Sequence, residues 1–236
     1  MFDPAATLRV VPIAPGQPCL VIDGALREPQ RLVALACAHR EAFAEGRDNA
    51  FPGPELAFGP DVVAQFEAQF NARARALLGG RRTLSSTARL SLATRAPHDL
   101  APLQTLCHVD GGALEPGHGI AACVLYLFHD PALGGTAFYA PRRPAEEIAR
   151  MKHDAATLPP EAFARRHGVA RGYMTAANAW YDKLLSVPAR FNRLIFYSGR
   201  VPHSGEIAHP ERLDPDPARG RLTINGFFRY TLRRVS

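Results

Sequence analysis

The segment AACVLYLFHDPALGGTAFYAP (residues 121–141) predicts two β-strands joined by a turn. The runs AACVLYLFHD and TAFYAP are rich in the aromatic and branched apolar residues that favour strands. Gly134-Gly135 precedes the second run, and glycine adopts the backbone angles that a turn requires. This stretch therefore indicates a fold built mainly from β-sheet.

Further strands are expected on the same grounds. They are CLVIDGAL (19–26), TARLSLATRA (87–96), NRLIFYSG (192–199) and LTINGFFRYTLRR (222–234).

Helices are expected before most of these strands. EPQRLVALACAHREAFAE (28–45) has apolar residues at roughly helical spacing, with Gly46 as a stop. DVVAQFEAQFNARARALLGG (61–80) would be capped by Asp61 and ended by Gly79-Gly80. Its expected buried stripe comprises Val62, Phe66, Phe70 and Leu77.

Residues 142–190 interrupt the strands with charged, helix-like sequence. PAEEIARMKHDAA (144–156) and LPPEAFARRHG (158–168) are its two clearest helical stretches. Helices followed by many strands predict an α+β domain whose sheets form a sandwich or jelly roll.

The bulk composition is that of an ordinary globular protein. The 236 residues are 47% hydrophobic and 21% charged, and the formal net charge is +6. Arginine gathers around 73–82, 142–166 and 229–234, which we interpret as solvated surface. No nucleic-acid-binding motif accompanies the charge, so a nucleic-acid partner is not expected.

Four cysteines, Cys19, Cys37, Cys107 and Cys123, have wide spacing without zinc-site character. The N-terminus lacks a basic start followed by a sustained apolar stretch, so we expect no secretory signal. Since no apolar run reaches membrane-spanning length either, we expect a reduced, cytoplasmic protein without a membrane partner.

The chemistry is expected at QTLCHVDGG (104–112) and RLIFYSGRVPHSGEI (193–207). His108 and Asp110 alternate with Val109, so on an extended segment both point to the same face. Two imidazoles and one carboxylate on one side of a metal form a facial triad with open positions, which suits iron(II). His203, at the end of an apolar strand, could complete that triad if the sheets pack together.

A candidate anion-binding residue follows in GRLTINGFF (220–228). Arg221 begins that strand, with Thr223 and Asn225 on the same face. An arginine there could hold the far carboxylate of a metal-bound oxo-acid through two parallel hydrogen bonds.

Taken in order, these motifs resemble the iron(II)/2-oxoglutarate-dependent dioxygenases of the prolyl 4-hydroxylase type. The resemblance covers about residues 88–140 and 190–232 and implies a double-stranded β-helix, a form of jelly roll. It implies iron binding by His108, Asp110 and His203, and 2-oxoglutarate binding by Arg221 and Tyr126. We expect one dioxygenase-like domain over residues 1–236, with helical support at 27–80 and a jelly-roll core at about 84–236 that carries the insert 142–190.

One spacing departs from the family pattern. Arg221 lies 18 residues after His203, which is longer than usual, so Arg212 and Arg219 remain rivals for 2-oxoglutarate. The Gly-Arg-strand context favours Arg221.

The expected activity is hydroxylation of an amino-acid side chain, free or in a peptide, with O2 as the oxidant. Asp110 argues against a halogenase, in which this ligand is lost. A non-enzymatic jelly roll that senses a metal or ligand is the alternative, and an oxygenase acting on RNA or DNA is a third hypothesis.

Overall fold

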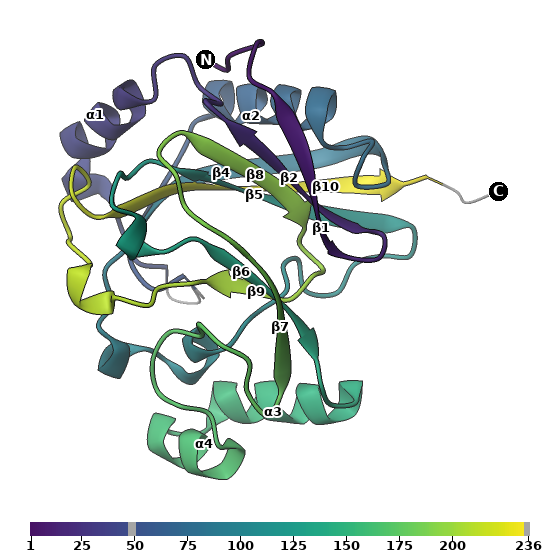
Figure 1. Ribbon diagram of the computed structural model, residues 1–236, viewed down its shortest axis with the longest axis vertical. Helices are drawn as coiled ribbons and strands as arrows, with labels where there is room; N and C mark the ends of the chain where they lie inside the picture. The colour runs from purple at the N-terminus through teal and green to yellow at the C-terminus, as the bar shows by residue number, and fades with distance from the viewer. Residues whose placement is uncertain (47–50, 234–236) are drawn as a thin grey trace.

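The computed structural model describes residues 1–46 and 51–233, and its strands form two antiparallel sheets (Figure 1). Arg234, the last residue of one expected strand, lies outside the described residues. The large sheet has the order β1 (Leu8–Ala14), β2 (Gln17–Asp23), β8 (Arg193–Ser198), β5 (His118–Tyr126), β10 (Arg221–Leu232), β4 (Gly80–Ala93) and β3 (Glu55–Ala57). The small sheet has the order β7 (Tyr181–Val187), β6 (Thr136–Pro141) and β9 (His203–Gly205).

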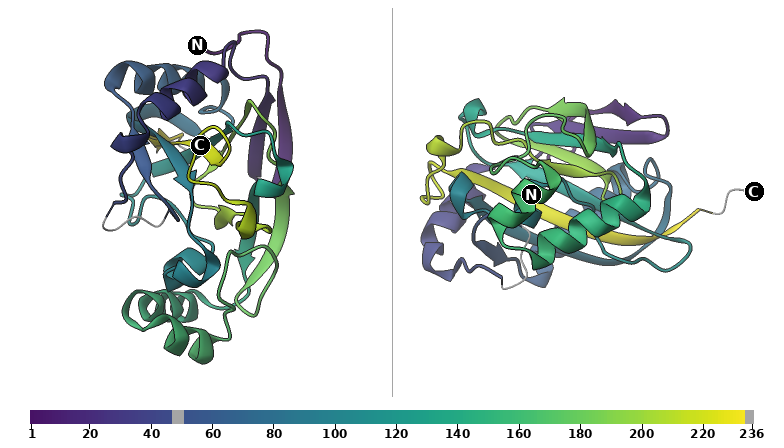
Figure 2. Two further views of the ribbon diagram at one scale, coloured as in Figure 1. Left: turned by 90° about the vertical axis from the view of Figure 1, so that its left-hand side faces the viewer. Right: turned by 90° about the horizontal axis from the view of Figure 1, so that it is seen from below.

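The four α-helices of the described residues lie in two pairs at opposite ends of the molecule (Figures 1 and 2). The pair α1 (Gln30–Ala38) and α2 (Pro60–Arg73) lies beside the large sheet, and the pair α3 (Ala145–Thr157) and α4 (Pro160–His167) lies beyond the small sheet. Short 3-10 turns occur at Arg40–Ala42, Pro97–Asp99, Pro102–Thr105, Pro131–Leu133 and Pro210–Arg212. The predicted architecture of β-sheets with supporting helices is confirmed in this form.

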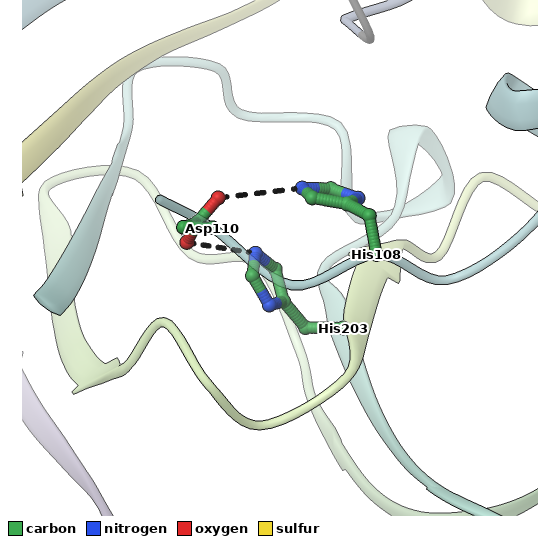
Figure 3. Close-up of side chains that lie close together, drawn as sticks. All are labelled: His108, Asp110 and His203. Atoms are coloured by element: carbon green, nitrogen blue, oxygen red, sulfur yellow. Dashed lines mark ion pairs between the residues drawn. The ribbon is translucent and has the colours of Figure 1, made fainter. Parts of the chain in front are cut away.

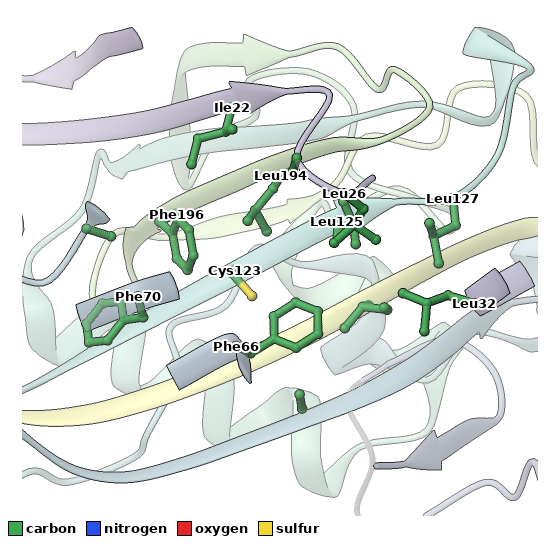
Figure 4. Packing of buried hydrophobic residues seen from close by; sticks show 14 of the residues in the cluster. Ile22, Leu26, Leu32, Phe66, Phe70, Cys123, Leu125, Leu127, Leu194 and Phe196 are labelled. Carbon is green, nitrogen blue, oxygen red and sulfur yellow. The ribbon is translucent and has the colours of Figure 1, made fainter. Parts of the chain in front are cut away.

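The large sheet is buried on both faces because its central strands are apolar on both. Leu194 and Phe196 of β8 pack in the cluster that includes Phe70 of α2 (Figure 4). Ile195, which alternates with them, packs in a second cluster with Phe138 of the small sheet. A strand that is covered on both faces has apolar residues at consecutive positions, as NRLIFYSG has.

A third cluster joins the small sheet to the second helix pair. Tyr139 of β6 packs there with Met151 of α3 and Phe163 of α4. The molecule therefore has four layers, in which the two sheets lie between two helical layers (Figure 2). A site between the sheets is supported from both sides.

Both N-terminal helices end earlier than the sequence predicts. α1 ends at Ala38 and not at Gly46, because a 3-10 turn follows at once. α2 ends at Arg73, where the amides of Ala74 and Arg75 both bond to the Phe70 carbonyl and the chain turns into β4. The expected ends at Gly46 and at Gly79-Gly80 are therefore wrong.

The details of α2 differ as well. Asp61 lies in the first turn behind the N-cap Gly59, and no side chain caps the helix. Val62 is partly buried, while Phe66 and Phe70 are fully buried. Leu77 lies beyond the helix and is 52% exposed, so its place in the buried stripe is wrong.

Four of the described strands occur where the sequence did not predict them. β1 and β3 form the edges of the large sheet, and β7 and β9 form those of the small sheet. Edge strands carry proline and charge, and here Pro12 lies in β1 and Lys183 in β7. The insert 142–190 thus contributes a strand to the small sheet in addition to its two predicted helices.

Among the residues described, no helix combines the length and the apolar character needed to cross a bilayer.

Phe70→Ala should destabilise the protein by about 3–5 kcal/mol, because it opens a cavity in the core. The Phe70 ring stacks on Phe228 at 4.4 Å between centroids and lies 6.0 Å from Phe196. Urea unfolding would measure the loss. Leu77→Ala is the matched control and should change stability by less than about 0.5 kcal/mol; an equal loss in both variants would contradict the observed end of α2.

Candidate metal centre

Three candidate ligands come from two segments that the backbone joins. His108 and Asp110 lie between the turn at Thr105 and β5, and His203 begins β9. The amide of His108 donates to the His203 carbonyl and the amide of His203 to the His108 carbonyl, both at 2.9 Å. The Asp110 amide donates to the Gly199 carbonyl at 2.7 Å. These three bonds fix the two segments side by side.

The three side chains converge (Figure 3). His108 Nε2 lies 3.7 Å from Asp110 Oδ1, and His203 Nε2 lies 3.5 Å from Asp110 Oδ2. One ligand atom from each residue lies within 4.8 Å of the other two. The predicted juxtaposition of His108, Asp110 and His203 is thus present in the structure.

The backbone orients the His203 ring. Its Nδ1–H donates to the Val201 carbonyl at 2.9 Å, which leaves the lone pair on Nε2, the atom that faces Asp110. Such a bond fixes the tautomer of a metal-ligating histidine. The Tyr197 ring packs against His203 with centroids 4.7 Å apart. His203 is therefore held in a form that can bind a metal.

Burial sets the charges at the centre. It raises the pKa of Asp110 to about 6 and lowers the pKa of His203 to about 4. It also lowers the pKa of His108, to which the charge of His203 adds. Within the described part of the chain, Asp110 Oδ2 is buried without a hydrogen-bond donor. Two neutral imidazoles and a carboxylate oxygen that lacks a donor form a set that a divalent cation would complete.

The ligands open into a cavity of about 340 Å³ that Arg221 also lines. The Arg221 side chain is only 4% exposed, and it donates from Nε to the Leu133 carbonyl and from Nη2 to the Gly135 carbonyl, each at 2.9 Å. Among the described residues no carboxylate lies within ion-pair distance of it. A buried cation without an acidic partner favours an anionic ligand.

The two rival arginines lie elsewhere. Arg212 is half exposed and paired with Asp130 at 2.5 Å. Arg219 is exposed and paired with Asp214 at 2.8 Å, in the same loop. Neither lines the cavity.

The other predicted site residues lie around Arg221. The Tyr126 hydroxyl shares a hydrogen bond of 2.8 Å with Thr136 Oγ1, and Thr136 lines the cavity. Thr223 is buried and donates to the Ser91 carbonyl at 3.3 Å, whereas Asn225 lines the cavity. Tyr126 thus lies behind Thr136, one residue away from the cavity wall.

Two further histidines are not part of the centre. His118 begins β5 beside Glu115, and His129 stacks on Phe191 with centroids 3.9 Å apart.

Sequence reasoning missed two charged residues in the cavity wall, Glu55 and Arg89. A signal for Arg89 was available, since Arg89 and Ser91 alternate with the apolar Leu90 and Leu92 and therefore share one face of the strand.

The family model described as DUF6445, family of unknown function, matches residues 4–228. None of the curated proteins matches the chain significantly.

Three solved structures are similar to this chain at low identity. A prolyl-4-hydroxylase from Pseudomonas putida is 17% identical, with a TM-score of 0.43 over 92% of this chain and 93% of its own. HygX from Streptomyces hygroscopicus, with nickel, 2-oxoglutarate and hygromycin B bound, is 13% identical, with a TM-score of 0.45 over 90% and 82%. An N-substituted L-amino acid dioxygenase from Burkholderia ambifaria is 10% identical, with a TM-score of 0.39 over 91% and 86%.

Gly199→Ala should weaken divalent metal binding by about 10- to 100-fold, the usual effect of disturbing a group that orients a metal ligand. A Cβ at Gly199 would lie 2.8 Å from Asp110 Oδ2 and would displace the carboxylate. Visible absorbance during cobalt(II) titration would measure the affinity. Gly205→Ala is the control, because its Cβ meets nothing closer than 3.5 Å; equal weakening in both variants would contradict the role of Gly199.

Proposed function

The chain belongs to the DUF6445 family of unknown function, and we propose that it is an iron(II)- and 2-oxoglutarate-dependent dioxygenase that hydroxylates a small molecule or a peptide. One observation carries the proposal. His108, Asp110 and His203 line the same cavity as Arg221, a buried cation for which the described residues provide no acidic partner. A metal site and an anion site in one cavity are what a metal-chelating dicarboxylate requires.

We further propose that the two facing sheets are a double-stranded β-helix and that residues 1–236 form one domain. The pairing of β6 with β9, and of β9 with the backbone at His108, supports this, because it extends the small sheet by one short segment. The helices of the N-terminal support and of the insert, α1 to α4, then lie outside the two sheets, while the insert adds β7 to the small sheet.

His108, Asp110 and His203 would hold iron(II), leaving the cavity side open to 2-oxoglutarate and O2. Bound together, these groups supply the oxidising chemistry, in which 2-oxoglutarate yields succinate and CO2 and a substrate C–H bond gains a hydroxyl group. Arg221 would pair with the far carboxylate of 2-oxoglutarate. Tyr126 would support that end through Thr136, to which its hydroxyl is bonded.

The protein's own contribution is placement and exclusion of water. The Arg221 guanidinium is already held by two carbonyls, so binding an anion requires little further ordering. Apolar residues such as Leu106 and Val124 form other parts of the cavity wall. A reactive group in this cavity is thereby kept beside its substrate and away from bulk solvent.

A cytoplasmic location is part of the proposal, since all four cysteines are free thiols. The alternative of a non-enzymatic sensor is not favoured, because a sensor of metal alone has no need of the buried Arg221.

Arg221→Gln should raise the 2-oxoglutarate concentration needed for half-saturation by roughly 10- to 100-fold, through loss of a charge-assisted hydrogen bond. Anaerobic titration of the iron(II) protein with 2-oxoglutarate, followed by the weak visible charge-transfer band of the chelate, measures this. Arg212→Gln and Arg219→Gln are matched controls and should titrate like the wild type. His108→Ala should lose the band altogether. Wild-type behaviour of Arg221→Gln would exclude the assigned cosubstrate site.

Enzyme and sensor differ in turnover. An oxygenase should convert 2-oxoglutarate slowly to succinate in air even without its substrate, and Asp110→Ala should abolish that conversion. Succinate is measured by chromatography after incubation with iron(II) and ascorbate. Tight iron(II) and 2-oxoglutarate binding without any succinate would instead support the sensor.

A further inference from the structure

A charged pair lies in the wall of the metal cavity, on the large sheet. Arg89 of β4 and Glu55 of β3 both line the cavity, and Arg89 Nη1 donates to Glu55 Oε2 at 2.9 Å. Ser91 Oγ donates to Glu55 Oε1 at 2.7 Å. The side chain of Glu55 is only 11% exposed. Since an ion pair that is only partly buried contributes little to the stability of a fold, its place in the wall points to a role in the cavity.

Arg89 is fixed but keeps hydrogen-bonding capacity. Its guanidinium lies over the Phe227 ring at 5.1 Å, and its side chain is 37% exposed. Within the described residues, Glu55 is its one hydrogen-bond acceptor, bound through Nη1. Arg193 is different, because its Nε and Nη2 both donate to the carboxylate of Asp23. Arg89 therefore retains the Nε and Nη2 donors with which arginine binds a carboxylate in the bidentate manner.

Asn225 extends this polar patch toward the metal. It is the direct partner of Arg89 in the β4–β10 ladder, and it lines the same cavity. No side-chain hydrogen bond of Asn225 occurs among the described residues. A molecule bound to Arg89 and Asn225 would thus lie in the same cavity as His108, Asp110 and His203.

Among the described residues that line the cavity, the formal charges would cancel once it is filled, and this step rests on the proposed function. Iron(II) would balance a dianionic 2-oxoglutarate, Asp110 would balance Arg221, and the carboxylate of Glu55 would offset the charge of Arg89. A substrate with a net charge would upset that balance in a poorly solvated space. A molecule with separated charges and no net charge would match it, with its anion beside Arg89 and its cation beside Glu55.

We propose that the substrate is a free α-amino acid bound as a zwitterion. Its carboxylate pairs with Arg89 and the amide of Asn225, and its ammonium group lies beside Glu55. The cavity of about 340 Å³ is near the lower end for ligand pockets, which suits 2-oxoglutarate together with one small molecule. An internal residue of a peptide has no such charges on its backbone and would leave the Arg89 donors unused.

The test is thermal unfolding of the anaerobic protein loaded with iron(II) and 2-oxoglutarate. One set of samples contains each standard L-amino acid, except cysteine and histidine, which bind metals themselves. A second set contains the N-acetyl amides of the same amino acids, which are not zwitterions. At least one free amino acid should raise the melting temperature in a concentration-dependent way, and its blocked form should not.

Arg89→Gln should raise the amino-acid concentration needed for that stabilisation at least tenfold, whereas Arg142→Gln should leave this concentration unchanged. Arg142 is the matched control, because it is also ion-paired, with Asp182 at 2.7 Å, but lies outside the cavity. Arg89→Gln removes the Arg89–Glu55 ion pair, so the double variant Glu55→Gln/Arg89→Gln serves if the single variant unfolds.

Three outcomes would each overturn the inference. They are stabilisation of the protein by the blocked forms as well, persistence of the stabilisation by the free amino acid in both Arg89 variants, and the absence of a response to any free amino acid. The charge-transfer band of the same samples reports separately on the metal and 2-oxoglutarate. If the band is missing while a free amino acid still stabilises the protein through Arg89, the dioxygenase proposal fails and the zwitterion site stands. If the band is present without any such stabilisation, the reverse holds.

Discussion

The reciprocal backbone pairing of His108 with His203 is the constraint on which the candidate centre depends. Two hydrogen bonds of 2.9 Å join residues that are far apart in the sequence and bring their imidazoles together. These bonds also satisfy the amide and the carbonyl of both residues, which would be costly to leave unpaired where they are shielded from water. The backbone hydrogen bonds that extend the small sheet therefore also position the candidate ligands. A third hydrogen bond, from the Asp110 amide to the Gly199 carbonyl, positions Asp110.

Much of the fold was predictable because the strands are apolar on both faces. AACVLYLFHD, TAFYAP and NRLIFYSG correspond to β5, β6 and β8 within a few residues. The features that could not be predicted from the sequence depend on where a segment lies in the tertiary structure. β1 and β7 are edge strands with weak strand composition, and Leu77 is exposed because the chain turns at Ala74. A local pattern of apolar residues does not indicate which of these residues packs against another helix or strand.

The candidate metal ligands could be predicted from the sequence, but the pairing of Glu55 with Arg89 in the cavity wall could not. The order of motifs indicated His108, Asp110 and His203, and the structure brings them together. The choice among Arg212, Arg219 and Arg221 depended on context in the sequence, whereas burial and pairing separate the three in the structure. Glu55 and Arg89 were missed because their pairing joins a three-residue strand to its neighbour across a long sequence separation, which no spacing rule reports.

Alternation along an extended backbone has one more consequence at Val109. His108 and Asp110 face the metal cavity, while Val109 between them also borders a groove under α3, beside Ile148 and Lys152. The partition between the two spaces is thus a single extended backbone. The same three-residue segment therefore borders the candidate centre on one side and the groove under α3 on the other.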